Sequence, residues 1–283
     1  MLGKGLKFFL QHPLWLTGSL LADPLEMWLK VQDRLAESRE RQGPVHRFEA
    51  EADWEPRLHD LLGVRFPCPA AAEFASLRPT VIGEMEAHGL RVGPMGFGGW
   101  NDGDAGLVRA IWCLVRHLRP RHVVETGVAH GVTSRFILEA LELDGAGDLS
   151  SIDLPPFDRV LQSQIGVAVD GRFSTRWSYI KGSSRRRLPG LLARLGDIEL
   201  FVHDSLHSER NVRFELDRAW RALRPGGAIV VDDIDGNNGF RSFTQAFSGH
   251  TALVCDSEPL RPEARRFNQK GQFGIILKLP MKQ

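Results

Sequence analysis

The sequence contains little cysteine, and its few cysteines lie far apart. Cys68, Cys113 and Cys255 are the three cysteines among 283 residues, and no two of them form a CxxC pair. Such spacing supplies neither a disulfide framework nor a zinc knuckle. We therefore expect a protein of a reducing compartment, the cytoplasm, whose fold depends on a large buried core rather than on cross-links.

An excess of charge of one sign is also absent, as is a long apolar run. The chain has 36 Lys and Arg against 35 Asp and Glu, a formal net charge of +1. Nucleic-acid-binding domains are usually strongly basic, so we expect no nucleic-acid partner. The apolar stretch at residues 8–22 is shorter than the ~20 residues that span a bilayer, so we expect no transmembrane segment. Gln11-His12-Pro13 interrupts that stretch, which favours an amphipathic helix over a signal peptide.

The first hundred residues differ in pattern from the rest. Residues 24–42, 53–63 and 70–88 have apolar side chains at helical spacing, and nothing before residue 100 alternates like a strand. Eight glycines then lie between residues 83 and 106, around Phe97 and Trp100. This composition suits either a linker or a lid that closes over a ligand. We divide the chain into a helical N-terminal extension with this glycine-rich lid, residues 1–100, and a second domain, residues 101–283.

From residue 106 onwards, short β-branched runs alternate with helical patterns. The predicted strands are 122–126, 149–153, 177–181, 198–203 and 228–233, and Pro225-Gly226-Gly227 is read as the turn into the last of them. Such alternation predicts right-handed crossovers and a parallel sheet. Two further strands, 251–255 and 273–279, have no helical pattern between them, which predicts an antiparallel addition at the sheet edge.

Polar or glycine-rich residues follow all five strands of this parallel series, where open α/β sheets bind their ligands. The turn Glu125–Gly131 reads E-x-G-x-x-x-G and lacks the dinucleotide fingerprint G-x-G-x-x-G. Carboxylates end three of the later strands, at Asp153, at Asp204 and at the pair Asp232-Asp233. These carboxylates favour a positively charged ligand, such as a sulfonium, over a phosphate.

The segment VVETGVAHG and the strands after it resemble class I S-adenosylmethionine-dependent methyltransferases over residues 122–283. The resemblance implies a Rossmann-like α/β sheet, mostly parallel with an antiparallel last strand, preceded here by the helical extension. It also implies that Gly127 and Gly131 face the methionine part of S-adenosylmethionine. Asp153 would bind the ribose, and Ser183 would lie near the adenine. Ala129 stands where many members have a middle glycine. The cofactor-binding residues implied are Glu125, Thr126, Gly127, Gly131, Asp153, Ser183 and Asp204.

The second half, HDSLHSERNVRFELDRAWRALRPGGAIVVDDI, resembles metal-dependent O-methyltransferases of macrolide sugars and other natural products. The resemblance implies that Asp204, Asp232 and Asp233 bind a divalent cation, usually Mg²⁺, and that His207 is the general base. Physical chemistry agrees, because neighbouring strand ends lie only ~5 Å apart. Carboxylates this close repel each other unless a hard cation binds them, and such a cation lowers the pKa of a bound hydroxyl.

We therefore expect an O-methyltransferase that acts on a hydroxyl of a sugar or natural-product small molecule, with Asp204 and His207 as catalytic residues. A homo-oligomer formed through the N-terminal helical region is a further expectation. Two other classes stay open. One is an NAD(P)-dependent oxidoreductase on a Rossmann-type sheet, which the absence of G-x-G-x-x-G disfavours. The other is a non-catalytic scaffold that keeps the methyltransferase fold.

Overall fold

The structure is a computed structural model that describes residues 23–40, 46–90, 97, 103–154, 156, 158–258 and 271–279. A sheet of seven strands in the order β3-β2-β1-β4-β5-β7-β6 lies at its centre. The strands are β1 His122–Thr126, β2 Asp148–Asp153, β3 Trp177–Lys181, β4 Ile198–His203, β5 Leu223–Val231, β6 His250–Asp256 and β7 Gln272–Lys278.

The pairing of the strands confirms the predicted fold class. The pairs among β1 to β5 are all parallel, and β7 runs antiparallel between β5 and β6. The residues of β4 are all buried, as are those at the end of β5, so both faces of the sheet are covered. Covered faces explain why these strands are continuous apolar runs rather than alternating ones.

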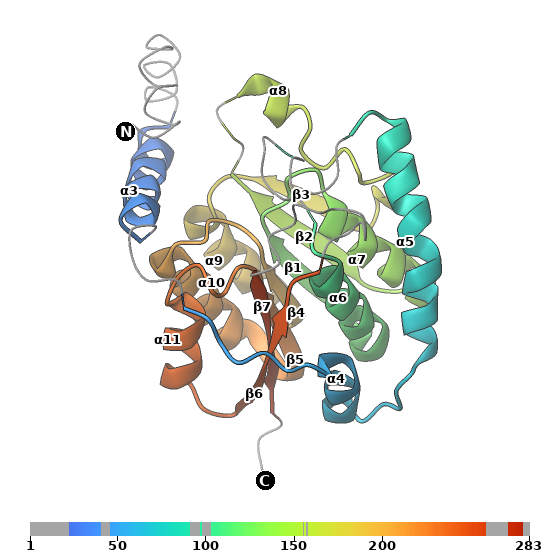
Figure 1. Cartoon of the computed structure of the whole chain (residues 1–283). Coiled ribbons are helices and arrows are strands. Elements are labelled where there is room, and N and C mark those ends of the chain that lie inside the picture. Colours follow the sequence, from blue (N-terminus) through green and yellow to red (C-terminus); the bar gives the residue numbers. More distant parts are fainter. Residues whose placement is uncertain are drawn as a thin grey trace.

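Two layers of helices cover the sheet, one on each face (Figure 1). The first layer contains α4 Trp54–Leu62, α5 Pro69–Ala87, α6 Ala105–Leu118 and α7 Val132–Asp144, and the second contains α9 Ser184–Leu195, α10 Glu209–Ala222 and α11 Gly239–Ala246. A single turn of helix, α8 Arg159–Gln162, follows β2.

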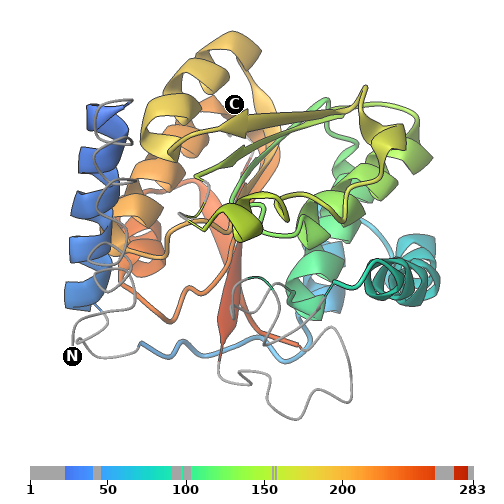
Figure 2. The same ribbon diagram turned by 90° about the horizontal axis from the view of Figure 1, so that it is seen from above.

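The N-terminal segments contact the sheet domain at two separate places. Helices α4 and α5 share one hydrophobic core with α6, and the indole N–H of Trp112 donates to the carbonyl of Ala70 at 2.8 Å. Helix α3, Pro24–Glu40, lies beside α10 on the other side (Figure 2), where Arg210 donates to Gln32 at 3.2 Å. The predicted boundary at residue 100 and residues 91–96 and 98–102 of the glycine-rich segment lie outside the described residues. Phe97 is described, and its buried ring lies edge-on to His130.

One local prediction was wrong. Pro225-Gly226-Gly227 is not a turn before the fifth strand but a bulge within β5. Ile198 of β4 pairs with Leu223 while Leu200 pairs with Ala228, so the intervening residues of β5 have no partner in register. None of the described helices is long and apolar enough to cross a membrane.

Candidate functional site

The glycine turn after β1 lies directly against the end of β4. The amide of Gly127 donates to the carbonyl of Ile152 at 2.9 Å, and the amide of Asp204 donates to the carbonyl of Thr126 at 2.8 Å. Gly127 has a φ of 88°, and a Cβ atom on it would overlap the carbonyl oxygen of Asp204. Only glycine fits this position, and the turn therefore holds the ends of β1, β2 and β4 together.

The rest of the turn keeps a glycine-like backbone. Gly131 has a φ of 86° and precedes the first turn of α7. Ala129 has a φ of 47°, so it adopts the left-handed conformation although it is not a glycine. Its carbonyl accepts a hydrogen bond from Gly166 at 2.9 Å, and that of His130 accepts one from Ala168 at 2.9 Å. The alanine thus changes the sequence motif without changing the course of the turn.

Glu125 is fully buried beneath the turn. One of its carboxylate oxygens accepts hydrogen bonds from the hydroxyls of Ser134, at 2.6 Å, and Ser151, at 2.7 Å. The other oxygen has no hydrogen-bond partner. Burial raises the pKa of Glu125 to about 8, although the two hydroxyls act in the opposite direction. This carboxyl group therefore supports the turn from behind and is largely protonated at neutral pH.

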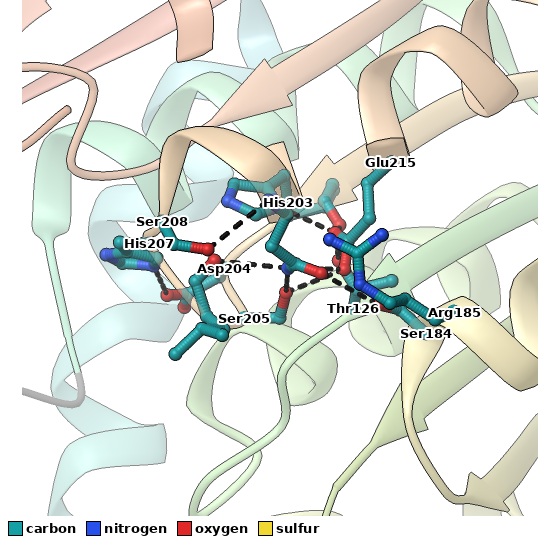
Figure 3. Close-up of polar contacts among 12 residues, drawn as sticks. Thr126, Ser184, Arg185, His203, Asp204, Ser205, His207, Ser208 and Glu215 are labelled. Atoms are coloured by element: carbon teal, nitrogen blue, oxygen red, sulfur yellow. Dashed lines mark hydrogen bonds and ion pairs between the residues drawn. The ribbon is translucent and has the colours of Figure 1, made fainter. Parts of the chain in front are cut away.

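The side chain of Thr126 points away from the carboxyl ends of the strands, into a buried polar network around Glu215 of α10 (Figure 3). The Glu215 carboxylate accepts hydrogen bonds from Thr126 at 2.5 Å, His203 at 2.6 Å and Ser205 at 2.8 Å. Asn211 also donates to it, at 2.9 Å. Burial acts to raise the pKa of Glu215, but the charge and hydrogen bond of His203 lower it to about 2. The sequence did not point to Glu215, whose hydrogen bonds join the end of β1 to the end of β4.

Asp153 lies at the end of β2, beside the glycine turn. Burial raises the pKa of Asp153 to about 6, and hydrogen bonds from the backbone amides of Ala129, Val128 and Leu154 oppose that shift. The group is therefore mostly ionised at neutral pH. An ionised carboxylate at the end of the second strand can accept hydrogen bonds from ribose hydroxyls, so the ribose-binding role that the resemblance implies for Asp153 stays a prediction.

Ser183, predicted to lie near the adenine, is bound by the N-terminal helix α3. Its amide and its hydroxyl donate to the two carboxylate oxygens of Glu26, at 2.6 and 3.1 Å. Arg186 pairs with both Glu26 and Asp23. The start of α3 thus lies against the residues that follow β3, a contact that the sequence did not predict.

Four of the predicted residues gather at the ends of β4 and β5. Ligand atoms of Asp204, His207 and Asp232 lie within 4.8 Å of one another, at the spacing of a metal site. The Nδ1 of His207 bonds to Asp233 at 2.8 Å, and its Nε2 faces Asp204 at 3.6 Å without a hydrogen-bond partner. Asp233 therefore lies behind His207 rather than within the group of ligand atoms.

The electrostatics of this group favour a bound cation. Burial and the charges of Asp233 and Asp204 raise the pKa of Asp232 well above its usual range. Burial acts to lower the pKa of His207, but the negative charges of Asp233, Asp204 and Asp232 around it raise it well above its usual range. Burial acts to raise the pKa of Asp233, whereas the charge of His207 lowers it. Two oxygen donors and one unpartnered nitrogen therefore suit a divalent cation, which would offset the carboxylate charge.

Comparison with known proteins supports the fold. Residues 124–234 match the family model described as "Methyltransferase domain". Among solved structures, a Klebsiella pneumoniae protein assigned to the O-methyltransferases is 16% identical, with a TM-score of 0.50 over 80% of this chain and 96% of that one. The O-methyltransferase from Bacillus cereus, solved with S-adenosylhomocysteine, is 15% identical, with a TM-score of 0.50 over 80% of this chain and 97% of that one. No curated protein matches the chain.

The family match covers residues 124–234, and the strand order is that of the Rossmann-like methyltransferase fold, as the sequence motifs predicted. The match favours a methyltransferase over the oxidoreductase alternative.

Proposed function

We propose that this methyltransferase moves the methyl group of S-adenosylmethionine to a hydroxyl of a small molecule, a sugar or another natural product, with the help of a divalent cation. The observation that carries the proposal is the convergence of Asp204, His207 and Asp232 at two neighbouring strand ends. The glycine turn, where the cofactor of this fold binds, contacts Asp204 directly. A methyl donor and an activated hydroxyl can therefore meet above β1 and β4.

In this proposal, the cofactor lies along the ends of β1, β2 and β3. Gly127 and Gly131 leave room for its methionine part, and Asp153 accepts hydrogen bonds from its ribose. Ser183 lies on the adenine side together with Glu26, which already holds its two donors. Glu125 and Thr126 support the turn from opposite faces of the sheet and so preserve its shape.

The acceptor lies at the ends of β4 and β5. Asp204 and Asp232 hold the cation, which when bound lowers the pKa of the acceptor hydroxyl. His207 takes the proton at Nε2 while Asp233 fixes the ring through Nδ1, a pairing that is typical of a histidine base. Asp233 was expected to bind the metal, but its oxygen bonds to His207, which favours this orienting role.

The methyl-transfer assay for this proposal uses isotope-labelled S-adenosylmethionine and panels of glycosides and phenols, each with and without Mg²⁺. We expect labelled glycoside only when Mg²⁺ is present, and about a hundredfold loss of rate in Asp204→Asn. Full activity in excess chelator would refute the role of the cation. Methylation of phenols but not of glycosides would refute the acceptor class.

The role of His207 can be separated from that of a metal ligand. If His207 is the base, His207→Ala lowers kcat about a hundredfold and leaves the Mg²⁺ concentration for half-maximal rate unchanged. A parallel loss of Mg²⁺ affinity would instead make its nitrogen a ligand. His88→Ala is the matched control, because His88, at the end of α5, bonds to the carbonyl of Glu84 at 2.7 Å and is not one of the site residues.

A homo-oligomer formed through α3 remains part of the proposal. Leu25, Trp28, Val31 and Leu35 form an apolar stripe on this helix and are 55%, 59%, 38% and 54% exposed. A second copy of the helix would cover the stripe, and light scattering, which measures the mass in solution, compares Trp28→Glu with the wild type to test it.

We also propose a cytoplasmic location, because all three cysteines are free thiols.

A further inference from the structure

Two cysteines and two histidines meet away from the methyltransferase site, where α4, α5 and α6 join. His59 lies on α4, Cys68 immediately precedes α5, and Cys113 and His117 lie one turn apart on α6. Figure 1 shows α4 beside the lower ends of α5 and α6. The end of α6 leads into the start of β1, whereas the glycine turn follows the end of β1, so the cluster lies at the opposite ends of the strands. The proposed methyl transfer uses none of these residues.

Three of the side chains form one close group, and His117 joins it through Cys68. The Nε2 of His59 lies 3.0 Å and the Nε2 of His117 lies 3.3 Å from the Sγ of Cys68. Ligand atoms of His59, Cys68 and Cys113 all lie within 4.8 Å of one another, and these three residues are buried. In a tetrahedral zinc site with ordinary bond lengths, neighbouring nitrogen and sulfur ligands are about 3.6 Å apart. The two histidine nitrogens therefore lie within a few tenths of an ångström of ligand spacing from Cys68, and His117 has to move closer to the rest of the group to complete the site.

The orientation of His59 favours a metal ligand. Its Nδ1–H donates to the backbone carbonyl of Glu55 at 2.7 Å, which leaves the lone pair of Nε2 directed at the cluster. Histidines that bind metals usually donate their other ring nitrogen to a carbonyl or carboxylate in this way. The imidazole of His117 lies edge-on to that of His59, with 5.2 Å between the ring centroids.

The charge of the group fits its burial. Binding of Zn²⁺ displaces the protons of the two thiols, which leave to solvent, and the resulting centre of two thiolates, two neutral imidazoles and one Zn²⁺ has no net charge. A neutral centre avoids the large cost of burying an uncompensated ion. Two cysteines and two histidines are also the donor set of many structural zinc sites.

We propose that His59, Cys68, Cys113 and His117 bind a structural zinc ion that fastens α4 and the start of α5 to α6. The end of α6 lies four residues before β1, so the ion joins the N-terminal extension to the first strand of the methyltransferase domain. This inference is independent of the acceptor and of the proposed Mg²⁺ site.

The test measures the metal content of the full chain, purified without chelator or nickel resin from zinc-supplemented cells. We expect about one zinc ion per chain in the wild type and about a tenfold loss or more in Cys68→Ser and Cys113→Ser. Cys255→Ser is the matched control, since Cys255 is an equally buried thiol outside the cluster, and it should keep its zinc. Asp204→Asn should also keep it.

Cobalt substitution tests whether the two thiolates bind a metal ion even if a cysteine variant fails to fold. Co²⁺ bound by two thiolates gives a thiolate-to-cobalt charge-transfer band, which an oxygen and nitrogen site such as Asp204 and Asp232 does not give. We expect this band in the wild type and in Asp204→Asn. Zinc below about a tenth of an ion per chain without such a band, or a disulfide between Cys68 and Cys113 in the purified protein, would overturn the proposal.

Discussion

Replacement of Gly127 by alanine is the sharpest test of how the glycine turn meets β4. A Cβ atom at this position would overlap the backbone carbonyl oxygen of Asp204, and backbone cannot rotate away as a flexible side chain can. The turn and the strand end would have to separate. Their separation would break the hydrogen bonds that join Asp204 to Thr126 and Gly127 to Ile152, at 2.8 and 2.9 Å.

The expected magnitude follows from these contacts. A left-handed alanine costs about 1–2 kcal/mol. Each broken hydrogen bond costs about 1 kcal/mol, and forcing extra atoms into a packed region costs about 1–3 kcal/mol. We therefore expect Gly127→Ala to lower the free energy of unfolding by roughly 5 kcal/mol, or to lower the Tm by roughly 10 °C or more. Urea unfolding followed by tryptophan fluorescence measures the loss.

Gly145→Ala is the matched control. Gly145 also has a positive φ, of 68°, but a Cβ atom on it would meet no atom within 4 Å. It should lose only the cost of the backbone conformation, about 1–2 kcal/mol. An equal loss in the two variants would refute the close approach of the glycine turn to β4.

Two further predictions concern the buried carboxyl groups. Glu125 has a pKa of about 8 in the folded protein, above its value in the unfolded chain. Between these two pKa values the unfolded chain gives up the proton more readily than the folded protein does, so the wild type loses stability as the pH rises from one to the other. Glu125→Gln lacks this loss and should gain up to ~5 kcal/mol relative to wild type between about pH 5 and pH 9. Urea unfolding at both pH values checks it, and a gap that does not change with pH would contradict it. Glu215→Ala should lose ~3–5 kcal/mol, because it leaves His203 buried without its partner. Glu215→Gln should lose less in the same assay, and a loss below about 1 kcal/mol in the alanine variant would show that the network adds little.

The sequence predicted the sheet well because its signal is local. The strands from β1 to β5 are short segments that end at or just before a glycine or an aspartate, and the rules for parallel crossovers bring their carboxyl ends to the same side of the sheet. The neighbouring positions of Asp204 and Asp232 followed from that topology alone. Even the departure at Ala129 had little effect, since its φ of 47° keeps the course of the turn.

The remaining features depend on contacts between distant segments. Glu215 looks like one more charged residue of a surface helix, although it lies between the buried Val212 and Leu216, and that interruption of an apolar face was the available signal. The backbone of Asp233, with a φ of 48°, turns its carboxylate to His207, and no spacing rule predicts such a conformation.

The cluster of cysteine and histidine side chains was missed for the same reason. No two cysteines form a CxxC pair, and Cys68 and Cys113 are brought together only by the packing of α5 on α6. The one local sign is the spacing of Cys113 and His117, four residues apart on one helix, which places both on the same face. The contact of Glu26 with Ser183 is likewise a tertiary one, between α3 and the start of α9.

Calorimetric titration of the full chain with S-adenosylmethionine, in the wild type and in Asp153→Ala, tests cofactor binding without knowledge of the acceptor. We expect saturable binding of about one cofactor per chain, weakened about tenfold or more in Asp153→Ala, which loses the carboxylate proposed to bind the ribose. Binding that is unchanged in Asp153→Ala would contradict the proposed placement of the cofactor. Failure of the folded wild type to bind would favour a non-catalytic scaffold instead.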